Sequence, residues 1–144
     1  MAITPIFFDS VFIVALHNNA DQHHDKAIRV MEEVLAEFYP YARVLTDFIM
    51  DEAVTYIKDR GRNTLLAIEA ALRIKEGVDY RLELITPEEF QESYLLFVKL
   101  RDKGWSFTDC TSYIWMKKHG VKYAVSMDAD FDQFDIAENL VRRL

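Results

Sequence analysis

Four acidic residues lie beside or within apolar stretches at widely separated points of the chain. Asp9 follows IFF, Glu52 lies in FIMDEAV, Asp109 in SFTDC, and Asp128 ends YAVSMD. An unpaired carboxylate is costly to hold near a core, and converging carboxylates raise one another's pKa. A divalent cation such as Mg²⁺ or Mn²⁺ relieves both costs, because oxygen ligands suit these ions. The pattern therefore predicts a metal site shared by these four residues.

Two neighbouring acids, Asp51 and Glu52, compete for one of the four positions. A helix is predicted over about 47–59, with an apolar face through Ile49 and Tyr56. Glu52 comes three residues after the first of these and four before the second, so it shares the apolar face, whereas Asp51 points away. Glu52 is therefore the functional candidate. A structural acid paired with an arginine is the alternative for Glu52.

The last two positions are also contested. Asp109 stands near the start of a predicted helix and can equally be a first-turn acid favoured by the helix dipole. In SMDADFDQFD only Asp128 adjoins a predicted strand end, while Asp130 can assist through a water. The other acids of this segment, Asp132 and Asp135, are assigned to the surface.

Two serines, Ser10 and Ser126, closely flank the candidate acids. Their hydroxyls can orient a carboxylate or a metal-bound water, and they can equally cap a helix or end a strand. Cys110 follows Asp109 and is expected to be a small buried residue, with a catalytic thiol as the alternative. Cysteine and histidine spacing typical of zinc sites is absent.

The elements that must position these residues alternate along the chain. Strands are predicted at 3–8, 42–45, 80–85 and 123–126, and helices after Asp9 and at about 21–38, 47–59, 64–75, 87–103 and 106–119. The last residues are compatible with a short helix and an edge strand. This alternation predicts a parallel sheet covered on both faces, with a ligand site beyond the carboxyl ends of its strands. Asp9 and Asp128 would then share one edge.

The bulk properties predict one globular domain over residues 1–144, with 51% hydrophobic residues. The apolar runs are far shorter than a membrane span and the start lacks signal-peptide features, so no membrane association and a cytoplasmic location are expected. A net charge of −7 is unusual for a nucleic-acid enzyme, although acids gathered around a metal account for part of it. Basic groups at 58–62, 117–122 and 142–143 can bind phosphates or be solvated. Aromatic residues at 105–115 can stack on bases or pack in the core.

With these residues in place, the chain resembles the PIN-domain ribonucleases, and most closely the toxins of the VapBC toxin–antitoxin type. The matching segments are FFDS, HHDKA at 23–27, TDFIMDEAVTYI at 46–57, SFTDCTSYIWMKKHGV at 106–121 and YAVSMDADFDQF at 123–134. Their ordered set spans nearly the whole chain. The resemblance implies a three-layer α/β/α sandwich around a central parallel sheet. It carries the family's acidic quartet onto Asp9, Glu52, Asp109 and Asp128.

The resemblance further implies endonucleolytic hydrolysis of RNA with Mg²⁺ or Mn²⁺, a homodimer and a small antitoxin partner. Asp9, Asp109 and Asp128 would hold the ion, with Asp130 beside them, and Glu52 would ligate it or orient the attacking water. A PIN-fold module that binds RNA or protein without cleaving is the main alternative. The segment YAVSMDADF is also similar to dehalogenase-like phosphatases, but the chain after Asp128 is too short for the rest of such a domain.

Overall fold

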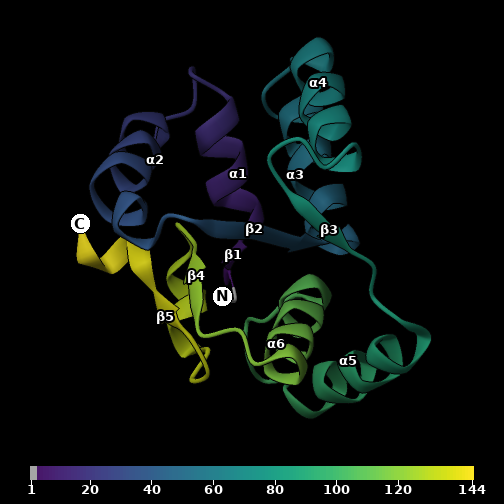
Figure 1. The fold of residues 1–144 in the computed structure, drawn as a ribbon. Helices are drawn as coiled ribbons and strands as arrows, with labels where there is room; N and C mark the ends of the chain where they lie inside the picture. The colour runs from purple at the N-terminus through teal and green to yellow at the C-terminus, as the bar shows by residue number, and fades with distance from the viewer. Residues whose placement is uncertain (1–2) are drawn as a thin grey trace.

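A parallel sheet forms the centre of the computed structural model, which describes residues 3–144 (Figure 1). Within those residues the sheet has five strands in the order β3-β2-β1-β4-β5, and every neighbouring pair is parallel. The strands are β1 (Thr4–Phe8), β2 (Tyr41–Thr46), β3 (Arg81–Glu83), β4 (Tyr123–Val125) and β5 (Glu138–Asn139). The predicted α/β class is confirmed, and β1 is the central strand.

Helices cover both faces of this sheet. Figure 1 shows α1, α2 and α4 above β2, and α5 and α6 below it. The α-helices are α1 (Ser10–His17), α2 (His24–Arg29), α3 (Asp47–Asp59), α4 (Thr64–Lys75), α5 (Pro87–Lys99) and α6 (Phe107–His119). No helix within residues 3–144 is long and apolar enough to cross a membrane. The arrangement is the expected α/β/α sandwich.

The predicted continuous helix over 21–38 is wrong. After α2 the chain forms a π-helix, η1 (Val30–Val34), and a 3₁₀-helix, η2 (Leu35–Phe38). The amide of Leu35 bonds to the Val30 carbonyl five residues back, and both side chains are fully buried. Residues five apart diverge in an α-helix, so the wider π turn is what brings this pair to the core side.

The predicted end of the helix that begins after Thr86 is also wrong, because α5 stops at Lys99 rather than 103. Leu100, which directly follows α5, is partly buried, and the next three residues, Arg101 to Lys103, are exposed. A longer helix would therefore bury no further apolar surface. The start agrees with prediction, since Thr86 and Glu89 form a capping box.

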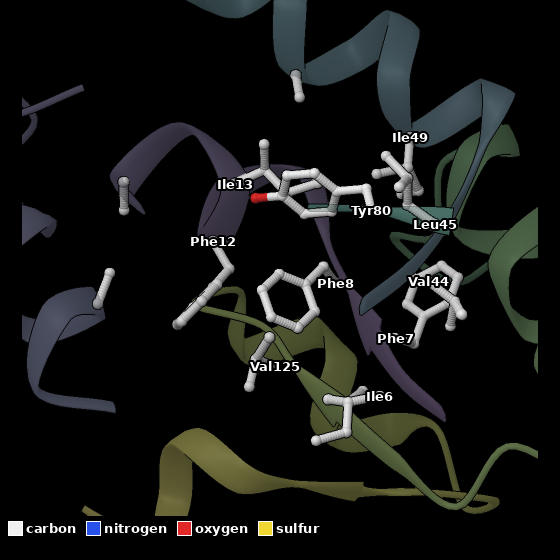
Figure 2. Packing of buried hydrophobic residues seen from close by; sticks show 14 of the residues in the cluster. Ile6, Phe7, Phe8, Phe12, Ile13, Val44, Leu45, Ile49, Tyr80 and Val125 are labelled. Atoms are coloured by element: carbon white, nitrogen blue, oxygen red, sulfur yellow. The ribbon is translucent and has the colours of Figure 1, made fainter. Parts of the chain in front are cut away.

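The core is built around β1, whose residues Ile6, Phe7 and Phe8 are fully buried. Figure 2 shows Phe8 beside Phe12 of α1 and near Tyr80, with ring centroids 5.5 and 5.8 Å away. Phe7 lies on the opposite face and packs against Trp115 of α6, with 6.1 Å between the ring centroids. A central strand of a parallel sheet is apolar on both faces, which explains the uninterrupted IFF run. The strand thereby delivers Asp9 to a defined place at the sheet edge.

The aromatic residues of 105–115 pack within the protein. Trp115 is 2% exposed and stacks on His119 at 4.3 Å between ring centroids. Phe107 lies 5.2 Å from Phe90, and Trp105 lies 4.6 Å from Phe134. These contacts favour the packing interpretation over a base-stacking platform at these positions.

Gly61 is required by a close approach of backbone where α3 ends. A Cβ there would lie 2.6 Å from the Ile57 carbonyl oxygen, whereas a Cβ on Gly104 would have no atom within 4 Å. We expect Gly61→Ala to lower the free energy of unfolding by about 1–3 kcal/mol, because backbone must move. Gly104→Ala should change it by less than about 0.5 kcal/mol. Urea unfolding of both variants tests this, and equal midpoints would contradict it.

Candidate active site

Asp9 lies where β1 passes into α1, at the carboxyl end of the central strand. Its backbone amide donates to the Val125 carbonyl of β4 at 3.1 Å. Its carboxylate accepts from the Ser10 amide at 2.9 Å and from the Ser126 hydroxyl at 2.7 Å. The side chain is only 8% exposed. Asp9 is thus fixed between the ends of β1 and β4.

Ser126 connects Asp9 to Asp128 and to the edge strand. Besides donating to Asp9, its buried hydroxyl accepts from the Asp128 amide at 3.1 Å. The side chain of Asn139 in β5 bonds to both backbone groups of Ser126, accepting from N–H at 3.1 Å and donating to C=O at 2.9 Å. Four hydrogen bonds therefore determine where Ser126, and with it Asp9, can lie.

Glu52 reaches the same edge from α3. Its carboxylate accepts a hydrogen bond from the Ser10 hydroxyl at the start of α1. Glu52 as a residue is exposed, so it faces Ser10 from the rim of the site and does not lie in the core. Asp51 is exposed too, and its carboxylate instead accepts from Thr55 of its own helix at 3.4 Å. The two acids of this pair therefore have different surroundings. The predicted inward position of Glu52 is wrong, however, because the buried face of α3 runs through Ile49, Ala53 and Ile57, whereas Glu52 and Tyr56 are exposed.

Asp109 arrives from the other side of the sheet, in the first turn of α6. It forms a capping box with Ser106, accepting from the Ser106 amide at 2.9 Å and donating its own amide to the hydroxyl at 3.0 Å. The helix-capping alternative for Asp109 is thus present in the structure. Asp128 is half-buried and accepts from the amide of the exposed Asp130 at 2.9 Å. Each candidate acid is oriented by a neighbouring N–H or O–H.

The raised pKa values of Asp9, Glu52 and Asp109 indicate that the carboxylates at this edge influence one another. Burial, opposed by hydrogen bonds from Ser126 and Ser10, raises the pKa of Asp9 to about 6, and the charges of Asp109 and Glu52 add to the rise. Desolvation also raises the pKa of Glu52, and the hydrogen bond from Ser10 opposes this rise. The charges of Asp109 and Asp128 add to it. The pKa of Asp109 is raised mainly by desolvation and further by Asp128. Carboxylates that destabilise one another's charge gain most from a cation.

The donor set fits a hard divalent ion. Four carboxylates and the two serine hydroxyls are all oxygen ligands of the kind Mg²⁺ and Mn²⁺ prefer. As the side chains stand in residues 3–144, no three acidic, histidine or cysteine groups are close enough to enclose an ion. Two of these carboxylates accept hydrogen bonds from neighbouring groups, Glu52 from the Ser10 hydroxyl and Asp128 from the Asp130 amide, and each keeps free lone pairs for an ion.

Several residues of this edge escaped sequence reasoning. Asn139 lies in the C-terminal stretch, where the expected edge strand and short helix are present, but its bond to Ser126 has no local sequence signal. Ser106 was expected only as the start of a helix, although the spacing S-x-x-D is the signature of a capping box.

Cys110 is fully buried, as predicted, and burial raises its thiol pKa to about 11. A thiol with so high a pKa is a poor nucleophile at neutral pH.

No family model matches the chain. It is similar to the 23S rRNA-specific endonuclease VapC20 of Mycobacterium tuberculosis, in two strains, with 27% identity over 133 residues. The match covers 92% of this chain and 96% of the relative. The crystal structure of M. tuberculosis VapC20, described as a sarcin–ricin loop cleaving toxin, matches with a TM-score of 0.79 over 92% of this chain and 97% of that one.

The parallel sheet and its helical layers form a PIN-like α/β/α sandwich, which agrees with the similarity to this crystal structure. In sequence and in fold, the chain is similar to a VapC-type toxin.

The raised pKa of Asp9 makes the stability of metal-free protein depend on pH. An acid whose pKa is higher in the folded than in the unfolded state gains stability as pH falls through about 6 toward 3.8. Asp9→Asn should therefore stabilise the metal-free protein at pH 8 by about 1–3 kcal/mol and flatten this dependence. Urea unfolding in EDTA at pH 8 and pH 5 measures both effects. Exposed Asp51→Asn is the control, and a wild-type pH dependence in Asp9→Asn would refute the prediction.

Proposed function

We propose that the chain is a divalent-metal-dependent endoribonuclease that hydrolyses RNA phosphodiester bonds as the toxin of a type II toxin–antitoxin pair. The observation that carries this proposal is the convergence of Asp9, Glu52, Asp109 and Asp128 at one sheet edge. Each of the first three has a pKa raised in part by other members of the group. The same fold is found in an RNA-cleaving toxin, which supports the reaction class.

In this proposal Asp9, Asp109 and Asp128 hold one or two Mg²⁺ or Mn²⁺ ions, and Asp130 lies beside them. When bound, the metal lowers the pKa of a water and stabilises charge on the phosphate. Ser126 keeps the Asp9 carboxylate aimed at the site through its 2.7 Å bond. The Ser10 hydroxyl orients Glu52, which either ligates the ion or directs the attacking water. No side-chain nucleophile is needed.

A ribosomal RNA loop is the first substrate to test. The similar mycobacterial protein is named for 23S rRNA and described as cleaving the sarcin–ricin loop. We extend that substrate class to this chain because 92% of it aligns with the relative. The experiment incubates purified protein with a sarcin–ricin hairpin and with an unstructured RNA, in Mn²⁺ and in EDTA. Specific cleavage that occurs only in Mn²⁺ supports the proposal.

Glu52 and Asp51 provide an internal control for the site. Glu52→Gln should lower RNA cleavage at least about 100-fold, because it removes a carboxylate that the Ser10 hydroxyl orients and that interacts electrostatically with Asp109. Asp51→Asn should leave cleavage near wild type, since its carboxylate bonds only to Thr55 on the exposed side of α3. Single-turnover rates in Mn²⁺, with folding checked by circular dichroism, measure the difference. Equal losses would remove Glu52 from the catalytic group.

We further propose a homodimer and a small antitoxin partner. Two helices carry apolar side chains that are uncovered in the single chain. Leu65, Ile68 and Leu72 of α4 are 81, 59 and 56% exposed. On α5, Phe90 and Leu95 are also exposed. Soluble monomers rarely leave such contiguous apolar surface in water, so these helices favour an interface between protein chains.

The oligomeric state can be tested by placing a charge among the exposed apolar side chains of α4 or of α5. We expect a dimer for the wild type, and a monomer for either Ile68→Lys or Leu95→Lys, because a buried unpaired charge is costly. Asn19→Lys is the control, since Asn19 is an exposed polar residue in the turn after α1 and lies on neither helix. Light scattering coupled to size exclusion gives the mass. A monomeric wild type, or dimers in both lysine variants, would exclude this interface.

A further inference from the structure

A pocket of about 370 Å³ opens directly beside the acidic site, between α1, the turn that follows it, and α3. Ser10 and Glu52 belong to the pocket and to the acidic site, because they line the pocket and also form the hydrogen bond at the rim of the site. A group that enters the pocket is therefore adjacent to a phosphate held by the acids. A cleavage reaction on RNA needs such a place for the neighbouring nucleotide.

The walls of the pocket are apolar and aromatic. Val11 and Val14 of α1 form one side, and Tyr56 of α3 forms the other. Tyr56 comes four residues after Glu52, so the two side chains share one face of the helix. Tyr56 is 48% exposed, which leaves one part of its ring accessible to a ligand. Aromatic rings beside aliphatic walls are the surfaces on which unpaired bases stack.

The rim of the pocket carries hydrogen-bond acceptors on a well-held turn. Asp21, Gln22 and His23 line it, and the Asp21 carboxylate is the group among them that, when ionised, only accepts. The Asp21 amide bonds to the Asn18 carbonyl at 2.9 Å, and its carboxylate accepts from the His23 amide at 2.9 Å. The His24 ring is within 2.7 Å of the Ala15 carbonyl and ties the turn to α1. The Asp21 carboxylate is thus positioned before any ligand arrives.

The charge of the pocket indicates which part of a nucleotide it accepts. Asp21 and Glu52 are both carboxylates, so they repel a phosphate unless a cation lies between. An ionised carboxylate only accepts hydrogen bonds, and it therefore favours bases that carry an amino group. Uracil lacks an exocyclic amino group, whereas adenine, cytosine and guanine have one.

We propose that this pocket binds one unpaired nucleobase next to the scissile phosphate and prefers amino-bearing bases to uracil. Stacking on Tyr56 supplies the binding surface, and the Asp21 carboxylate supplies the preference. The inference rests on the proposed ribonuclease function, since it assigns a specificity subsite to that reaction.

Nucleoside binding tests the pocket separately from cleavage. Adenosine and uridine, which lack phosphate, are titrated to millimolar concentration into metal-free protein, and the methyl signals of Val11 and Val14 are followed by NMR. We expect saturable shifts with adenosine at least several-fold tighter than with uridine. Tyr56→Ala should weaken adenosine binding, whereas Tyr94→Ala should not. Tyr94 is the matched control because it is 49% exposed but lies on α5.

Cleavage then tests the link to the reaction. In Mn²⁺, Tyr56→Ala and Asp21→Asn should raise KM and reduce the preference for adenine over uracil beside the cut, with kcat near wild type. Equal shifts by both nucleosides, or none at either valine, would overturn the pocket proposal even if the wild type cleaves RNA. Adenosine binding through Tyr56 by a protein that cleaves no RNA would instead refute the proposed function. These two failures are therefore distinguishable.

Discussion

The hydrogen bond between Ser126 and the buried Asp9 carboxylate is the contact on which the candidate site depends. It joins the ends of β1 and β4, whose backbones also meet through the Asp9 amide and the Val125 carbonyl. A carboxylate 8% exposed is stable there only because two donors face it, and even so its pKa rises to about 6. The apolar packing of β1 offsets the remaining unfavourable free energy of burying this carboxylate, since Phe7 and Phe8 pack on opposite faces of the sheet.

Topology explains why the acids gather at this point. In the order β3-β2-β1-β4-β5 the chain moves outward from β1 in one direction and later returns to its other side. Ligand sites of open α/β sheets lie at such a switch, beyond the carboxyl ends of the strands. Asp9 and Asp128 follow the two strands that flank the switch. Glu52 comes from α3 and Asp109 from α6, so both helical layers contribute one acid each.

Periodic and punctuated segments were predictable from sequence. The IFF run and the Thr86-Pro87 start have local causes, an apolar strand and a capping box, and both agree with the structure. The segment 21–38 did not follow its pattern, because the burial of both Val30 and Leu35 is a tertiary demand that turns the helix into a π form. Asn139 was missed for a related reason. Its role arises from a bond to Ser126, 13 residues away, which no local pattern encodes.

The acidic character of the chain is compatible with an RNA substrate when its charges are considered by place. The C-terminal arginines are neutralised locally, Arg142 by Asp132 and Arg143 by Glu138, so they offer little free charge to a phosphate. The candidate site itself repels phosphate through its carboxylates. A bound divalent cation offsets part of this negative charge and gives the phosphate oxygens a positive partner. In the proposed function, substrate binding at this edge would thus be coupled to the cation, while base contacts in the neighbouring pocket would need no positive charge.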